Sequence, residues 1–157
     1  MKNANWKVYT LWIGLAEAAG LLSGLLSRGG MENFSQTVAQ PPLSPPGWLF
    51  PVVWTILYGL MGISAARIWI APESTERSRG LNLFIIQLVL NFFWTLIFFN
   101  AQAYGAAVIV LLLLWVAVLL MIMQFWKVER WAGLLQIPYL VWLTFAAYLN
   151  IGVWLLY

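Results

Sequence analysis

PPLSPPGWLFPVVWTILY, residues 41–58, places five prolines and two tryptophans at the mouth of an apolar segment. Proline has no backbone N–H donor and fixes φ, so the first part of this stretch predicts a rigid, extended lid. A helix is expected to begin at about Pro46, because proline is well tolerated in a first helical turn. A simple membrane anchor needs no such lid, and the stretch therefore points to a function beyond anchoring.

The rest of the chain is apolar enough to belong in a membrane, since 63% of its 157 residues are hydrophobic and 8% are charged. A helix needs roughly 20 residues to cross the hydrocarbon core. Five segments are long enough: Val8–Leu26, Trp48–Ile70, Leu81–Phe99, Ala103–Phe125 and Trp131–Leu155. Continuously apolar runs of this length exclude the alternating strands of a membrane barrel. We expect an all-α integral membrane protein, a bundle of five transmembrane helices in one domain over residues 1–157, with an outward-facing Pro-rich lid loop at about 28–46.

The basic residues predict the orientation, because lysine and arginine concentrate on the cytoplasmic side. In a five-span chain the N-terminus and the second and fourth loops lie on the same side of the membrane. That side carries seven basic residues, Lys2, Lys7, Arg67, Arg77, Arg79, Lys127 and Arg130, whereas the opposite side carries only Arg28. We therefore expect a cytoplasmic N-terminus and an external C-terminus. Topology and contact with the lipid bilayer explain the net charge of +3, and no nucleic-acid partner is expected.

The chain contains no cysteine and no histidine. Disulfides and thiolate chemistry are therefore excluded, as are the usual strong axial ligands of haem iron. The sequence also lacks a nucleophile–base pair and a phosphate-binding loop. We expect no metal site and no required cofactor, and we do not favour an enzyme.

One face of the third segment combines polar and aromatic residues: Gln87, Asn91, Trp94 and Phe98 recur at helical spacing. An amide that faces lipid is costly, so Asn91 should point into the bundle. This stripe predicts that the third helix contributes to an internal polar and aromatic region.

Two other helices carry aromatic faces at a similar depth. Trp54 and Tyr58 share a face of the second segment, and Tyr139 and Trp142 share a face of the fifth. A helical rise of about 1.5 Å per residue puts these residues and Asn91 in the same half of the membrane, below the lid. The sequence thus predicts a cavity there, walled by indoles and holding a few amides.

The eleven tryptophans have ordinary structural explanations as well. Interfacial anchoring is expected near helix ends, for Trp6, Trp48, Trp69, Trp126, Trp131 and Trp154. Packing between helices competes with ligand contact for the deeper Trp12, Trp54, Trp94, Trp115 and Trp142.

Three blocks of the sequence carry a resemblance to a known family. They are P-x-x-S-P-P-G-W-x-F-P-x-x-W-T-x-L-Y-x-x-M-G over residues 41–62, the run Gln87–Phe99, and the run Ile137–Asn150. Together they resemble the translocator protein family, also called tryptophan-rich sensory proteins, and they follow its order over essentially the whole chain.

The resemblance implies a bacterial-type receptor or sensor in the cell membrane that binds porphyrins, with protoporphyrin IX as the expected ligand, or similar flat hydrophobic molecules. It implies an outer-leaflet pocket below the first loop and a homodimer. Trp54, Asn91 and Trp142 match family positions that line this pocket. Further ligand-contact candidates are Tyr58, Trp94 and Phe98.

The lid side departs from the family pattern. Leu43 stands where the family usually has tryptophan, and the expected aromatic pair of the first loop reads Phe34-Ser35. We expect Phe34, Leu43 and Trp48 to form the lid, and to grip a ligand less strongly than in relatives.

Two other functions remain open. The first is light-dependent porphyrin breakdown, in which Trp54 and Trp142 would exchange electrons with the excited ring. The second is small-molecule transport, for which Glu17 is the acidic residue at membrane depth.

A ridge of small residues on the first segment bears on association. Ala16, Gly20 and Gly24 recur every four residues, a spacing that permits close helix contact. The ridge is expected either to pair two chains or to pack within one.

Overall fold

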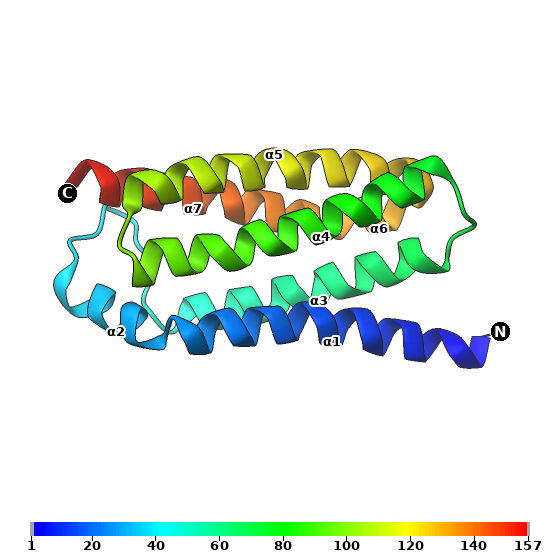
Figure 1. Ribbon diagram of the computed structural model, residues 1–157, viewed down its shortest axis with the longest axis horizontal. Coiled ribbons are helices and arrows are strands. Elements are labelled where there is room, and N and C mark those ends of the chain that lie inside the picture. Colours follow the sequence, from blue (N-terminus) through cyan, green and yellow to red (C-terminus); the bar gives the residue numbers. More distant parts are fainter. Residues whose placement is uncertain (1, 157) are drawn as a thin grey trace.

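The computed structural model describes residues 2–156, with side chains from residue 5 onward, so the side chain of Lys2 lies outside the described part. Every regular element in this range is helical (Figure 1). The elements are α1 (Lys2–Leu26), α2 (Arg28–Thr37), α3 (Leu49–Ile70), α4 (Thr75–Thr95) with a π-helical turn η1 (Leu96–Asn100), α5 (Tyr104–Val128), α6 (Arg130–Leu134) and α7 (Ile137–Leu156).

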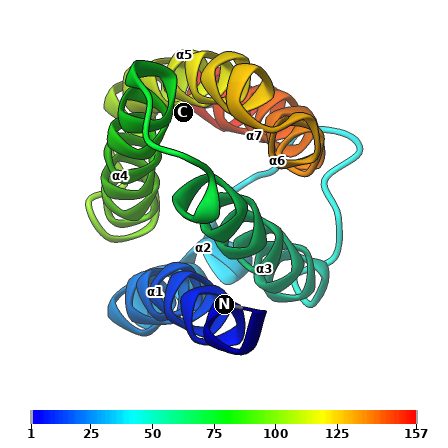
Figure 2. The same cartoon turned by 90° about the vertical axis from the view of Figure 1, so that its right-hand side faces the viewer.

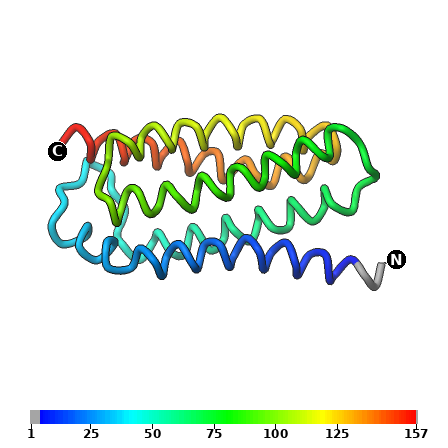
Figure 3. Tube along the Cα trace, viewed as in Figure 1, coloured from blue at the N-terminus to red at the C-terminus, as the bar shows by residue number. Residues whose placement is uncertain are grey.

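Five helical stretches in the described chain are long and apolar enough to span a membrane, which confirms the predicted class and number of spans. The chain starts at one end of the bundle and finishes at the other (Figure 3). We call these the N-terminal end, which also holds the α3–α4 and α5–α6 connections, and the α2 end, which also holds the α4–α5 turn (Figure 1).

Three boundaries differ from the sequence-based expectation. Residues 28–37, expected as loop, form α2, so the extended Pro-rich segment is confined to residues 38–48. Helix α4 begins six residues before Leu81, because the Ser74 side chain accepts a hydrogen bond from the Arg77 backbone N–H and caps it. The fifth span is divided at residues 135–136, and Pro138 stands in the first turn of α7, where its ring disfavours an uninterrupted helix from α6.

Helices α1 and α3 approach closely through two glycines. A methyl group added at Gly62 would lie 2.3 Å from Ile13 Cα, and one at Gly20 would lie 2.3 Å from the Tyr58 ring. Ala16 is fully buried, whereas Gly24 meets nothing within 4 Å. The small-residue ridge therefore packs largely inside the monomer, against α3.

Helix α1 lies at the margin of the bundle (Figure 2). Only 11% of its apolar window is buried, against 39% for α3 and for α5 and 44% for α4. Most of the surface of α1 is therefore left to lipid.

The N-terminal end carries a collar of cations on indole rings, which we define as three pairs: Lys7 over Trp6, Arg77 over Trp69 and Arg130 over Trp126. The three indoles are about half exposed, as interfacial anchors should be. The other predicted anchors, Trp48, Trp131 and Trp154, are likewise exposed, whereas none of the five deeper tryptophans is. The predicted division of the tryptophans is confirmed.

An ion pair joins two elements at the same end. Arg67 of α3 donates from Nε and Nη2 to the two carboxylate oxygens of Glu129, at 2.5 and 3.0 Å. The same carboxylate accepts from the backbone N–H groups of Trp131 and Ala132 and so caps α6. One side chain therefore ties α3 to the connection between α5 and α6.

Candidate functional site

An apolar groove of about 540 Å³ runs between α3 and α7. Its size falls in the range of small-molecule sites, roughly 300–1,000 Å³. Its lining residues are Val53, Leu57, Ile137, Pro138, Val141, Trp142 and Phe145. With no charged side chain among them, the groove suits a hydrophobic ligand.

Aromatic rings pack around Trp142, the indole that lines this groove. The ring centroids of Trp54 and Trp142 are 6.4 Å apart and the planes are nearly perpendicular, at 89°. Phe50 adds an edge contact to Trp142 at 5.9 Å, and Trp54 packs on Tyr58 at 5.6 Å and on Tyr139 at 6.1 Å. These edge-to-face contacts hold the indole of Trp142 beside the open groove.

The indole N–H of Trp142 is the polar feature of this wall. The nitrogen is buried, and no described group accepts its hydrogen bond. Two other deep indoles are paired, since Trp94 donates to Asn150 at 3.0 Å and Trp115 to Thr144 at 2.9 Å, whereas the buried nitrogen of Trp12, which does not line the groove, also lacks a described partner. Because buried donors are nearly always paired, the Trp142 N–H is a candidate donor to a ligand.

Asn91 lies behind the aromatic wall and does not line the groove. It is 1% exposed, which confirms that it points into the bundle. Its Oδ1 accepts from the Tyr58 hydroxyl at 2.7 Å, and its Nδ2 donates to the Tyr139 hydroxyl at 2.8 Å. That hydroxyl in turn donates to Gln87 Oε1 at 2.7 Å. Asn91 therefore holds the two tyrosine rings that support Trp54.

Trp94 and Phe98 belong to a second aromatic cluster. Both are buried, so the predicted stripe does face the interior, but Phe98 contacts Phe34, Phe99 and Tyr104 with centroids 4.8–5.2 Å apart. The structure thus brings Trp54, Tyr58 and Trp142 together, with Asn91 behind them, and places Trp94 and Phe98 elsewhere.

The expected lid residues are also separated. Phe34 packs in the second cluster, whereas Leu43 and Trp48 are 83% and 68% exposed. Leu43 has a left-handed backbone, with φ of 68°. These three side chains do not gather over the α3–α7 groove.

The Pro-rich segment instead fastens to the end of α7. The Tyr148 hydroxyl donates to the Pro42 carbonyl at 2.6 Å, and Pro41 packs on Gly152, where a methyl group would lie 2.7 Å from the proline ring. Tyr148 stacks on Phe145, which contacts Trp142 at 5.6 Å. A continuous row of rings along α7 therefore links the groove to the Pro-rich segment.

The sequence-based site missed several lining residues. Phe145 continues the spacing of Tyr139 and Trp142 by three, so the helical period could have identified it. Val53 and Leu57 are four residues apart and lie on either side of Trp54 in the sequence. An aliphatic residue in a transmembrane helix, however, looks the same in the sequence whether it lines a groove or faces lipid.

Among the described residues no three His, Cys, Asp or Glu side chains lie together as metal ligands would. Glu17 lies outside the groove, with a carboxylate oxygen 3.4 Å from where a methyl group on Gly59 would lie. The groove can pack a flat apolar molecule against the rings of Trp142 and Phe145.

Comparison with known proteins agrees with this architecture. Residues 12–155 match the TspO/MBR family. Protein CrtK of Rhodobacter capsulatus is 36% identical over 148 residues, covering 94% of this chain and 91% of the relative. The tryptophan-rich protein TspO of Chlorobaculum tepidum is 38% identical over 144 residues, covering 89% of each chain. The translocator protein of Bos taurus is 33% identical over 142 residues, covering 89% of this chain and 84% of the relative.

Proposed function

The chain belongs to the TspO/MBR family, and on that premise we propose that this membrane sensor or receptor binds a porphyrin in the groove between α3 and α7. Among its relatives are a tryptophan-rich sensory protein and a translocator protein by name. The observation that carries the proposal is the buried, unpaired N–H of Trp142 on the wall of an apolar groove of about 540 Å³.

A porphyrin matches this wall chemically. Its broad π-surface stacks on or meets edges of indole and phenyl rings, which Trp142 and Phe145 supply in the groove, with Trp54 packed against Trp142. Its peripheral carboxylates accept hydrogen bonds, and the indole N–H of Trp142 is a donor without a protein partner. Binding of this kind requires no residue to react.

The ligand is expected to bind through its ring and not through a metal. The chain has no histidine and no cysteine, so the strongest protein ligands for haem iron are missing. We therefore propose that metal-free protoporphyrin IX binds at least as well as haem.

The test is a titration of purified protein with protoporphyrin IX, followed by the absorption band of the porphyrin. Trp142→Phe should weaken saturable binding about tenfold, the factor for roughly 1.4 kcal/mol of lost stacking and hydrogen bonding. Trp131→Phe is the matched control, because Trp131 is 60% exposed and does not line the groove. Equal affinities for all three proteins would refute the site, and haem binding far more tightly than protoporphyrin would refute ring-based recognition.

We further propose that the N-terminal end faces the cytoplasm of a bacterial-type cell membrane and that two copies form a homodimer. The seven lysine and arginine residues at or near the N-terminal end support this orientation. The sparse burial of α1 leaves a long apolar helix available to lipid or to a second copy. Light scattering of the purified protein, corrected for bound detergent, distinguishes one chain from two.

A further inference from the structure

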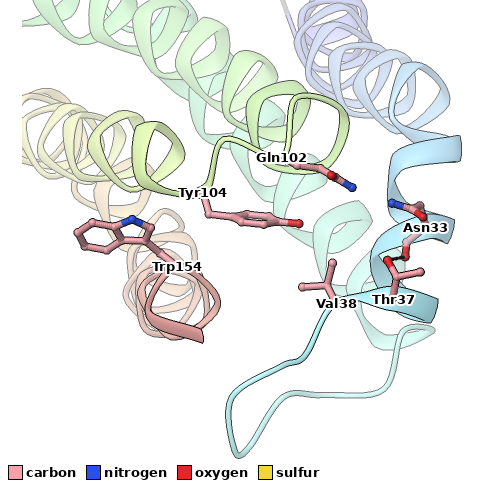
Figure 4. A pocket seen from close by; sticks show the side chains of 6 residues that line it. All are labelled: Asn33, Thr37, Val38, Gln102, Tyr104 and Trp154. Atoms are coloured by element: carbon pink, nitrogen blue, oxygen red, sulfur yellow. Dashed lines mark hydrogen bonds between the residues drawn. The ribbon is translucent and has the colours of Figure 1, made fainter. Parts of the chain in front are cut away.

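A second hollow, of about 400 Å³, opens at the α2 end and shares no lining residue with the α3–α7 groove. Three parts of the chain form it: α2 with residue 38 after it, the α4–α5 turn with the start of α5, and the end of α7. Its lining residues are Asn33, Thr37, Val38, Gln102, Tyr104 and Trp154 (Figure 4). We call it the end cleft.

Polar groups of different elements point into the end cleft. Figure 4 shows the amides of Asn33 and Gln102 extending toward each other from opposite sides, with the Tyr104 hydroxyl directed into the same space. The Thr37 hydroxyl donates a hydrogen bond to the Asn33 backbone carbonyl at 2.7 Å. The two amides thus offer both donors and acceptors to one occupant.

The backbone holds Gln102 in an unusual conformation. Its φ of 51° is left-handed, a conformation that residues other than glycine seldom adopt. Two backbone hydrogen bonds on either side of Gln102 fix the turn. The Ala101 N–H donates to the Leu96 carbonyl at 3.1 Å, and the Ala103 N–H donates to the Ile97 carbonyl at 3.2 Å. Strain of this kind is retained more often at functional sites than elsewhere.

The aromatic side of the cleft is also fixed. Trp154 lies on Gly105, where a methyl group would come within 2.9 Å of the indole nitrogen, so the glycine makes room for the ring. Tyr104 packs on Phe98 with centroids 5.0 Å apart. The cleft therefore combines held aromatic surface with amide groups.

The charge of the lining indicates the class of ligand. No lysine, arginine, aspartate or glutamate is among the described residues that line the cleft, so neither a phosphate nor an amine has a charged partner there. A neutral ring with several hydroxyls fits both features: the hydroxyls exchange hydrogen bonds with amides, and the C–H face packs on an aromatic ring. We propose that the end cleft binds the pyranose ring of a sugar, carried by a membrane glycolipid or free in solution.

The experiment uses the full chain in phosphatidylcholine nanodiscs. In one arm a minor fraction of monoglucosyl diacylglycerol is added, and native mass spectrometry measures how much stays bound to the protein. In the other, saturation-transfer NMR measures binding of methyl β-glucoside. Gln102→Ala and Asn33→Ala should each weaken binding about fivefold, the factor for one neutral hydrogen bond. Gln36→Ala is the matched control, because Gln36 is an exposed amide of α2 outside the cleft.

The outcomes decide both the site and the source of the sugar. Retention of the glycolipid alone identifies a lipid headgroup, and binding of the methyl glucoside identifies a free sugar. The proposal is overturned if neither probe binds, if both cleft variants bind like the parent, or if phosphatidylglycerol is retained better than the glycolipid. Asn33 lies on an exposed helix, so its variant keeps the test valid should Gln102→Ala fail to fold. Unchanged protoporphyrin binding by Asn33→Ala keeps this result separate from that of the groove.

Discussion

The sequence resemblance predicts that Asn91 contacts a ligand, yet both ends of its amide are hydrogen-bonded to tyrosine hydroxyls. We predict that Asn91→Ala lowers the free energy of unfolding by about 1–3 kcal/mol, because the buried Tyr58 hydroxyl loses its acceptor, whereas the Tyr139 hydroxyl keeps its hydrogen bond to Gln87. Loss of helical circular dichroism on heating in detergent measures this.

The controls test whether Asn91 supports the tyrosine rings or contacts the ligand directly. Gln36→Ala removes an exposed amide and should leave the melting temperature unchanged. Protoporphyrin affinity should fall less in Asn91→Ala than in Trp142→Phe. A variant as stable as the parent but unable to bind the porphyrin would show instead that Asn91 touches the ligand.

The pairing of Glu129 gives stability a defined pH dependence. Its hydrogen bond with Arg67, followed by those from the α6 backbone, lowers the pKa of this carboxyl from its ordinary value of 4.5. A group with a lowered folded-state pKa contributes stability above the unfolded pKa and loses it as pH falls through the folded pKa. At neutral pH, Glu129→Gln should therefore be less stable by about 1 kcal/mol, the usual worth of an exposed ion pair or a cap.

That difference should shrink as pH falls below about 4.5. Thermal melts at neutral pH and at successively lower pH check it, with Glu73→Gln as the control, an exposed acid at the same end. A deficit for Glu129→Gln that stayed constant down to the lowest pH would contradict the role of the charged carboxylate.

At the scale of elements, the Pro-rich segment is fastened to α7 by one side-chain hydrogen bond, from Tyr148 to Pro42. Tyr148→Phe removes it and keeps the ring that stacks on Phe145. We predict that amide hydrogen exchange within residues 38–48 becomes about fivefold faster, as loss of one hydrogen bond allows. Exchange in α5 should not change, and acceleration spread over the whole bundle would mean that Tyr148 stabilises the fold generally.

The five spans could be predicted because apolar length is a strong signal that needs no partner. Helix α2 could not, since RGGMENFSQT is polar and contains two glycines. Its contacts are distant in sequence: Phe34 packs on Phe98 and Phe99, and Gly30 lies against the backbone of Phe99. Tertiary packing, not local propensity, decides such a helix.

The site shows the same limit. Helical spacing placed Asn91 on an inward face, and burial confirms this. It could not show that two tyrosines from other helices occupy both ends of the amide, because that depends on how three helices meet. The spacing also grouped Trp94 with Trp54, although Trp94 donates to Asn150 in a separate cluster.

At the scale of the whole molecule, the absence of cysteine makes the orientation simple to test. Single cysteines at exposed positions, Ser78→Cys at the N-terminal end and Gln36→Cys at the α2 end, mark the two sides. In intact cells a membrane-impermeant maleimide should label the second and not the first, since cations favour the cytoplasm. Labelling of Ser78→Cys alone would show that the protein has the reverse orientation. The groove would then lie in the opposite leaflet from the one proposed.

The cation–indole collar also fixes where the protein sits along the membrane normal. Three ring-and-cation pairs anchor one end at the headgroup level, and nothing comparable appears among the described residues at the other end. A bilayer thinner or thicker than the helices must therefore be accommodated at the α2 end. The Pro-rich segment and the end cleft lie at that end. We therefore expect the acyl-chain length of the surrounding lipid to change how deeply the end cleft sits among the headgroups.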